Sequence, residues 1–190
     1  MADVWPHLLI AKRFIEKNPG KIADEQAFYD GSLYPDTVNW EEKDITHFGK
    51  RGERTDMLKR HLEKVGVEDF LKKHSLDSDF NKGWYLHLIT DYEFYNNLID
   101  NDYLKSITDI SVFSTDRIYS LRYYTDTLRD KYDTLTILKK SSLEQKQLEL
   151  LKEWDAADLK RFGKDGPQGK LLYTLEELEA FIERMSDTNI

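Results

Sequence analysis

Hydrophobic residues recur every three or four positions along most of this chain, which is the spacing of one face of an α-helix. In residues 4–17 the hydrophobic positions of this face are Leu8, Leu9, Ala11, Phe14 and Ile15. The residues Asn-Pro-Gly at 18–20 end the pattern, because proline cannot continue a helix and glycine commonly follows one. The first segment is therefore predicted to be a helix.

The same spacing predicts further helices and very little strand. The predicted helices cover about residues 24–30, 56–65, 67–74, 79–99, 115–132, 142–154 and 174–185. The helix at 24–30 is expected to stop near Gly31. Expected N-caps are Thr55, Ser114 or Thr115, Ser141 or Ser142, and the capping box of Thr174 and Glu177. Only residues 109–113 and 170–173 show a weak strand pattern. We expect one all-α domain over residues 1–190, with about seven or eight helices.

Composition limits the classes of function. The chain has 28 Lys and Arg against 36 Asp and Glu, a net charge of −8 and no cysteine. The acidic balance argues against binding of a nucleic-acid polymer, because neutralising phosphates needs excess basic residues. Without cysteine, any metal site must use His, Asp and Glu. The N-terminus lacks a signal-peptide pattern and no segment approaches a membrane span, so we expect a cytoplasmic protein without integral membrane association.

One pair of residues in the predicted helix 79–99 has the spacing of a metal site. His87 and Asp91 lie four residues apart, so both side chains leave the same face of the helix. An imidazole and a carboxylate placed in this way can bind one divalent cation. The alternative is a buried histidine that forms an ordinary structural hydrogen bond with the aspartate.

Three further residues have both a functional and a structural interpretation. His47 lies in an irregular segment, and such segments often carry function. Asp36 follows Pro35, where an Asx turn at a helix end is the simpler interpretation. His7 follows Trp5-Pro6 and could simply pack near the start of the first helix.

Taken in order, these residues resemble a known family. The blocks Tyr34-Pro-Asp36, Thr46-His-Phe48 and Gly-Trp-Tyr-Leu-His-Leu-Ile-Thr-Asp at 83–91, preceded by His7, resemble the zinc-dependent phospholipase C family and the related single-strand nucleases of the P1 type. The likeness covers about residues 1–100 and is greatest to the short, largely uncharacterised bacterial branch of that superfamily. It implies the all-α phospholipase C fold.

The resemblance also implies roles for the five residues. Asp36, His47, His87 and Asp91 would hold one zinc ion, and Asp91 would bridge to a second ion that His7 also binds. In such enzymes a metal pair about 3.5–4 Å apart activates a water and neutralises phosphate oxygens. Asp36 would be the catalytic residue that orients or deprotonates this water.

The chain departs from the family pattern at two points. Family phospholipases use the free amine of an N-terminal Trp as a ligand, whereas Trp5 here follows four residues. The third metal of the family needs histidines after the bridging aspartate, but Asn97 stands at the first such position and no histidine follows His87. We therefore expect one or two ions, Zn²⁺ first, with Fe, Mn, Co or Ni as alternatives for a His and Asp site.

A basic loop follows His47. Lys50 and Arg51 lie between Gly49 and Gly52, and Arg54 follows them; these basic residues could dock a substrate phosphate. The alternative is that they are ordinary solvated charges.

These observations favour a metal-dependent phosphoester hydrolase, acting on a small phosphoester or a phospholipid head group. The alternative is a non-catalytic helical protein with a structural or sensing metal site, and the missing third metal favours it. A phosphohydrolase of the HD type is disfavoured, because the chain contains no adjacent His-Asp pair.

Overall fold

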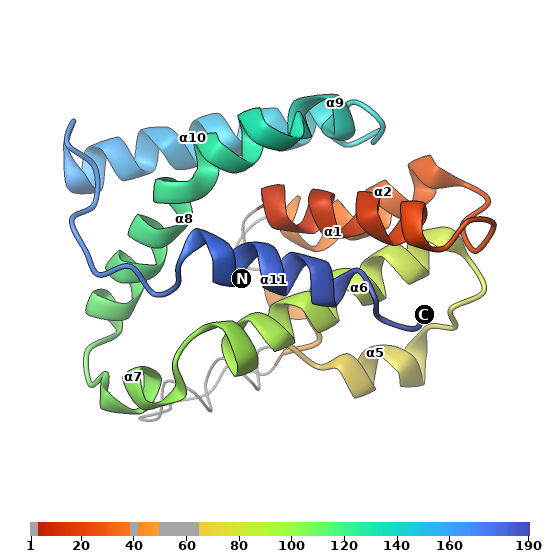
Figure 1. Cartoon of the computed structure of the whole chain (residues 1–190), viewed down its shortest axis with the longest axis horizontal. Helices are drawn as coiled ribbons and strands as arrows, with labels where there is room; N and C mark the ends of the chain where they lie inside the picture. The colour runs from red at the N-terminus through yellow and green to blue at the C-terminus, as the bar shows by residue number, and fades with distance from the viewer. Residues whose placement is uncertain (1–3, 39–41, 50–64) are drawn as a thin grey trace.

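The computed structural model describes residues 4–38, 42–49 and 65–190. Within these residues it contains ten α-helices and no β-strand (Figure 1). The α-helices are α1 (Val4–Lys17), α2 (Glu25–Leu33), α3 (Lys43–Thr46), α5 (Val67–Lys73), α6 (Asp79–Glu93), α7 (Asn101–Ser106), α8 (Ile110–Tyr132), α9 (Thr134–Leu138), α10 (Glu144–Phe162) and α11 (Leu175–Met185), joined by the 3-10 helix η1 (Tyr34–Asp36) and the π-helix η2 (Phe94–Leu98).

The all-α prediction is confirmed, but the expected number of seven or eight helices is too low. The helices α3, α7 and α9 have only four, six and five residues, which is too short for a hydrophobic period to show. Asp133 adopts a left-handed backbone conformation, with φ of 49°, and separates α9 from α8. The phospholipase C fold stays a prediction.

Both predicted strands are wrong. Residues 110–113 form the first turn of α8, because the side chain of Asp109 accepts a hydrogen bond from the Ser111 N–H and caps the helix. Residues 170–173 run beside α8 without joining a sheet. The Lys170 N–H donates to Asp116 Oδ1 at 2.8 Å, and the Leu172 N–H donates to Ser120 Oγ at 2.9 Å. Side chains of α8 thus accept the backbone hydrogen bonds that a neighbouring strand would otherwise accept.

Several predicted helix boundaries also differ. The cap at Ser114 or Thr115 is wrong by about one turn, since α8 starts at Ile110. Ser141 and Ser142 do not cap α10, because both hydroxyls donate to Asp30. The helix α2 continues through Gly31, and α6 gives way to the π-helix after Glu93. The predicted helix 56–65 lies outside the described residues, apart from Val65, which is not helical.

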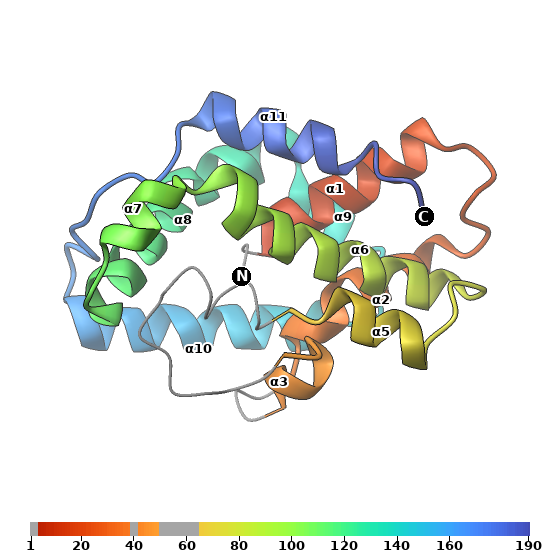
Figure 2. The same cartoon turned by 90° about the horizontal axis from the view of Figure 1, so that it is seen from below.

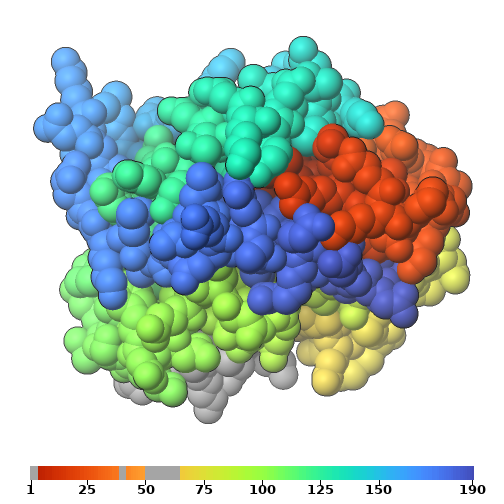
Figure 3. Space-filling view, viewed as in Figure 1, coloured from red at the N-terminus to blue at the C-terminus, as the bar shows by residue number. Residues whose placement is uncertain are grey.

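Helix α1 forms the centre of the core. Its residues 4–11 are all buried, and it packs against α2, α6, α8, α9 and α11. Figure 2 shows α11 along one side of the molecule and α10 along the opposite side, with α1 and α6 between them. In the space-filling view of Figure 3, α11 lies across the face, with α8 and α9 on one side and α6 and α7 on the other. This arrangement places the N-terminal histidine and the aromatic helix α6 in the interior.

Among the described helices, α2 and α6 share the most extensive contact. A Cβ atom at Gly31 would lie 1.9 Å from Phe80 O, and one at Gly83 would lie 2.0 Å from Phe28 O. Because both neighbours are backbone atoms, only glycine permits this approach. The contact brings the carbonyl groups of α2 within reach of the side chains of α6.

None of the helices in the described part of the chain combines the length and hydropathy that crossing a bilayer requires.

Candidate metal centre

Five predicted site residues meet in the interior. His7 comes from α1, Asp36 from the end of η1, His47 from the end of α3, and His87 and Asp91 from α6. All five side chains are buried, and none of these residues is more than 5% exposed. Two groups of three have ligand atoms within 4.8 Å of one another, namely His47 with His87 and Asp91, and His7 with Asp36 and His87. The sequence separation is large, so only the fold brings them together.

The group of His47, His87 and Asp91 has the spacing of a metal-binding triad. The two Nε2 atoms lie 3.3 Å apart, and Asp91 Oδ2 lies 3.4 Å from His47 Nε2 and 3.6 Å from His87 Nε2. Ligand atoms bound to zinc at about 2.0–2.1 Å in a tetrahedron lie about 3.3–3.4 Å apart. These three atoms therefore already have the separations that one small divalent cation requires.

The tautomers of the two rings follow from their outer partners. His87 Nδ1 lies 2.8 Å from Ser32 O, and His47 Nδ1 lies 2.8 Å from Lys43 O. A carbonyl oxygen only accepts, so each Nδ1 carries the proton and donates it. In the neutral rings each Nε2 therefore presents a lone pair to the other ring and to the Asp91 carboxylate. Three acceptors that face one another are stabilised by a cation between them, and this outer hydrogen bonding is typical of metal-ligating histidines.

His7 lies against the opposite side of His87. The two rings stack with centroids 3.9 Å apart, and His7 Nε2 lies 3.4 Å from Asp91 Oδ1. Neither ring nitrogen of His7 has a hydrogen bond of good geometry to any described residue. A buried imidazole without such a bond is costly, and within the described part of the chain His7 has only the 3.4 Å contact with Asp91.

Asp36 is the outermost of the five residues. Its Oδ1 atom lies 3.8 Å from His47 Nε2 and only 2.7 Å from Lys43 Nζ. This ion pair is itself buried, with 10% of the lysine side chain and 7% of the aspartate side chain exposed. Lys43 was not among the predicted site residues. Its position four residues before His47, on the same helical face, is the only sequence signal for it.

The electrostatics keep both carboxylates ionised. Burial alone raises the pKa of Asp36, but the Lys43 ammonium, with smaller contributions from His87 and His47, outweighs burial and brings the pKa well below its usual range. Burial likewise raises the pKa of Asp91, but its contacts with His47 and His7 help to hold it well below the ordinary value. Burial, with the neighbouring His7, lowers the pKa of His87 to about 3. At neutral pH the cluster thus has charged carboxylates and a neutral His87, the forms that bind metals.

The loop that carries His47 is anchored from two sides. Trp84 Nε1 donates to Thr46 O at 2.8 Å, and the Thr46 hydroxyl donates to Pro35 O at 3.1 Å. The first bond ties α3 to α6, and the second ties it to η1. These bonds fix the backbone on either side of the cluster, so the ligand atoms are held in place before any ion binds.

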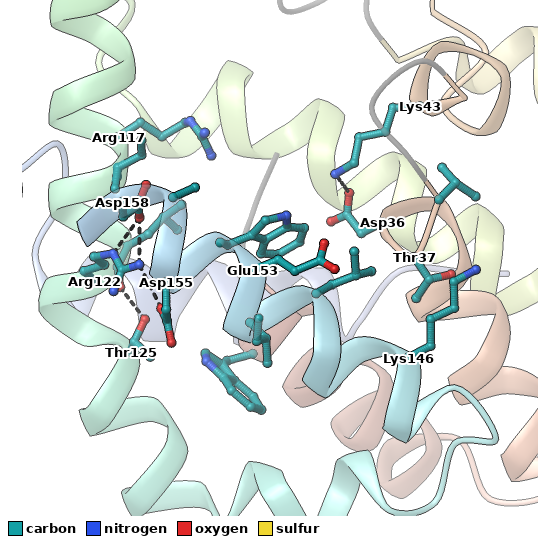
Figure 4. Close-up of a pocket in the computed structure, with 18 of the residues that line it drawn as sticks. Asp36, Thr37, Lys43, Arg117, Arg122, Thr125, Lys146, Glu153, Asp155 and Asp158 are labelled. Carbon is teal, nitrogen blue, oxygen red and sulfur yellow. Dashed lines mark hydrogen bonds and ion pairs between the residues drawn. The ribbon is translucent and has the colours of Figure 1, made fainter. Parts of the chain in front are cut away.

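A cavity of about 880 Å³ adjoins the cluster at Asp36 and Lys43. Figure 4 shows these two residues on one side of it and Arg117, Arg122 and Asp158 on the other. Helices α8 and α10 supply most of the wall, including Trp154 and several hydrophobic side chains. Arg122 is held by Asp155 and Asp158 at 2.8 and 2.7 Å. This cavity was not predicted, since no residue after 100 was expected to take part in chemistry.

The predicted phosphate-docking residues Lys50, Arg51 and Arg54 lie outside the described residues. No protein-family model matches the chain, and neither a curated protein nor a solved structure is significantly similar to it. The assignment to a family therefore stays a prediction, and function must be argued from the cluster and the cavity.

Proposed function

We propose that this chain is a metal-dependent hydrolase of phosphoesters, with His47, His87 and Asp91 as the principal ligands and Zn²⁺ as the first candidate metal. The observation that carries the proposal is the Nε2 to Nε2 separation of 3.3 Å between two rings whose Nδ1 atoms both donate to backbone carbonyls. Such facing lone pairs favour a bound cation. The blocks that resemble the zinc-dependent phospholipase C family imply these three ligands as well, together with Asp36.

A divalent cation bound here would supply a Lewis acid for a phosphoryl oxygen and would lower the pKa of a water. The protein supplies the approach and the orientation. Asp36 and Lys43 are the members of the site that line the cavity, so a substrate reaches the cluster along this edge. Because the adjacent ammonium lowers the pKa of Asp36, its carboxylate is a weak base. Asp36 is better suited to orient a water by hydrogen bonding than to remove its proton.

The second candidate is a structural or sensing metal site without catalysis. Burial favours it, since His87 and Asp91 are 1% and 0% exposed. Structural zinc sites have a closed ligand set, whereas catalytic sites keep one open position. The cavity beside Asp36 is the observation that favours catalysis.

The test is hydrolysis of a generic phosphomonoester and a generic phosphodiester by the purified full chain, with added Zn²⁺ or Mn²⁺. We expect turnover that disappears in His87→Ala and Asp91→Ala but not in His74→Ala, a histidine outside the cluster. Bound metal without turnover would replace this proposal by the structural one. A protein that binds no metal would contradict both.

A further inference from the structure

Lys43 is an unusual neighbour for a metal cluster. Its ammonium lies 2.7 Å from Asp36 Oδ1 and 5.3 Å from the centroid of the Trp154 ring. The carboxylate and the indole hold it from two directions, in a site with little access to water. Asp36 belongs to the second group of potential ligands, with His7 and His87. The positive charge of Lys43 thus already lies on an oxygen that a second metal ion would need.

The two groups of potential ligands cannot both be filled as they stand, because they share His87. The Nδ1 of this ring donates to Ser32 O, which leaves one lone pair, at Nε2, for one ion. Once an ion binds His47, His87 and Asp91 Oδ2, the remaining donors are His7, Asp36 and the other oxygen of Asp91. Lys43 Nζ lies 2.7 Å from Asp36 Oδ1, so a second ion would have to share the Asp36 carboxylate with an ammonium, and only His7 and Asp91 Oδ1 remain as undisputed ligands for it.

The charges agree with this ligand count. At their formal charges, Asp36, Asp91 and Lys43 together carry one net negative charge among the described side chains of the cluster. One divalent ion changes this to one net positive charge, which a single anionic group arriving from the cavity can balance. A second divalent ion would add two further charges in a region where water cannot screen them.

From these observations, and resting on the proposed function, we infer that the cluster holds one divalent ion and that the Lys43 ammonium takes the place of a second. Lys43 is then a positioning residue that keeps Asp36 off the metal and presents a positive charge at the cavity. Of the one or two ions expected from the sequence pattern, the inference selects one.

The inference is tested by metal stoichiometry. The full-length protein is loaded with Zn²⁺, dialysed and measured by mass spectrometry of the metal. The Lys43→Met variant removes the charge and keeps a similar side-chain length, whereas Lys43→Arg keeps the charge. Lys146→Met is the control, because it changes another lysine of the same cavity wall. We expect one zinc per chain in the natural protein, Lys43→Arg and Lys146→Met, and two in Lys43→Met, because Asp36 is then free to join His7.

Two zinc ions in the natural protein would overturn the inference while leaving the proposed hydrolase intact. One zinc in a Lys43→Met variant with a native circular dichroism spectrum would also overturn it. No zinc in the natural protein would contradict the proposed function itself, so the two failures are distinguishable. If Lys43→Met does not fold, Lys43→Gln provides the same comparison with a polar side chain, and the count in the natural protein remains decisive.

Discussion

His87 Nε2 and His47 Nε2 lie 3.3 Å apart, while the Nδ1 atom of each ring lies 2.8 Å from a backbone carbonyl oxygen. The carbonyls belong to Ser32 and Lys43, so each ring orientation depends on a different helix. Removing either ring leaves the other acceptors in place with one ligand fewer. The metal affinity should therefore respond strongly to single substitutions.

The first prediction concerns metal content. His87→Ala and Asp91→Ala should each lower the affinity for Zn²⁺ by more than the about 10–100-fold that loss of an outer partner costs. Isothermal titration of the metal-free protein measures this affinity. His74→Ala is the matched control, because His74 packs on Phe70 and Trp84 instead of joining the cluster. Unchanged zinc binding in both cluster variants would show that the ligand assignment is wrong.

The second prediction is a loss of stability of the metal-free protein on acidification. His87 has a pKa of about 3 in the folded chain against 6.5 for an ordinary histidine. Between these values the unfolded chain binds a proton at His87 that the folded chain does not bind. The free energy of unfolding therefore falls as the pH decreases from about 6.5 toward 3. The slope from one such group is up to about 1.4 kcal/mol per pH unit. Urea denaturation at several pH values measures it.

The carboxylates of Asp36 and Asp91 affect stability at a lower pH than His87 does. The pKa values of Asp36 and Asp91 are also lowered by folding, so they add to the loss of stability below about pH 4, where unfolded aspartates begin to bind protons. A free energy of unfolding that stays constant from pH 7 to pH 5 would contradict the burial of a neutral His87.

The third prediction tests the close packing of α2 and α6. Gly83→Ala introduces a Cβ atom 2.0 Å from Phe28 O. A backbone oxygen cannot rotate away, so the helices must separate, at a cost of about 3 kcal/mol or more. The separation should also lengthen the bond from His87 to Ser32 and weaken zinc binding. Thr127→Ala on the exposed side of α8 is the control, and equal melting temperatures for the two variants would refute the expectation.

The fourth prediction concerns the anchor of His47. Trp84→Phe keeps an aromatic ring among Tyr34, Phe48 and Phe70 but removes the hydrogen bond to Thr46 O. The buried carbonyl then lacks a donor, which costs about 1–3 kcal/mol. We expect a lower denaturation midpoint together with weaker zinc binding. Lower stability with unaltered zinc affinity would mean that this bond supports the fold alone.

The fifth prediction concerns stability far from the cluster. Thr174 caps α11, where its side chain and that of Glu177 each accept a hydrogen bond from the other residue's backbone N–H. Thr174→Ala should reduce the free energy of unfolding by about 1 kcal/mol. Zinc affinity should stay the same, because α11 supplies no ligand. A change in metal binding would reveal a coupling of α11 to the cluster through α1, against which it packs.

Local features of the fold were well predicted where one signal dominated. The bounds of α1 and the capping box of α11 are confirmed. The start of α8 was not predicted, because the β-branched residues Ile110 and Val112 resemble a strand while a side-chain cap makes them helical. Local propensity is a weak prior that a cap or a tertiary contact overrides.

In the cluster, too, some features could be predicted from the sequence and others could not. The resemblance of the residue blocks to the zinc-dependent phospholipase C family selected the five residues that the structure brings together, although their role as ligands stays a prediction. Lys43 and the cavity could not be found in this way. The role of Lys43 depends on its contact with Asp36, which lies in a different segment. The cavity lies between η1 and the helices α8 and α10.

The positions of the three proposed ligands along the chain have a mechanical consequence. His47 lies at the end of α3, and His87 and Asp91 lie in α6, in a protein without a single cysteine. A bound ion is therefore a reversible crosslink that restricts the unfolded chain between residues 47 and 91, as a disulfide does elsewhere. Chelation should loosen α3 and α6 together, while the capped helix α11 keeps its own hydrogen bonds.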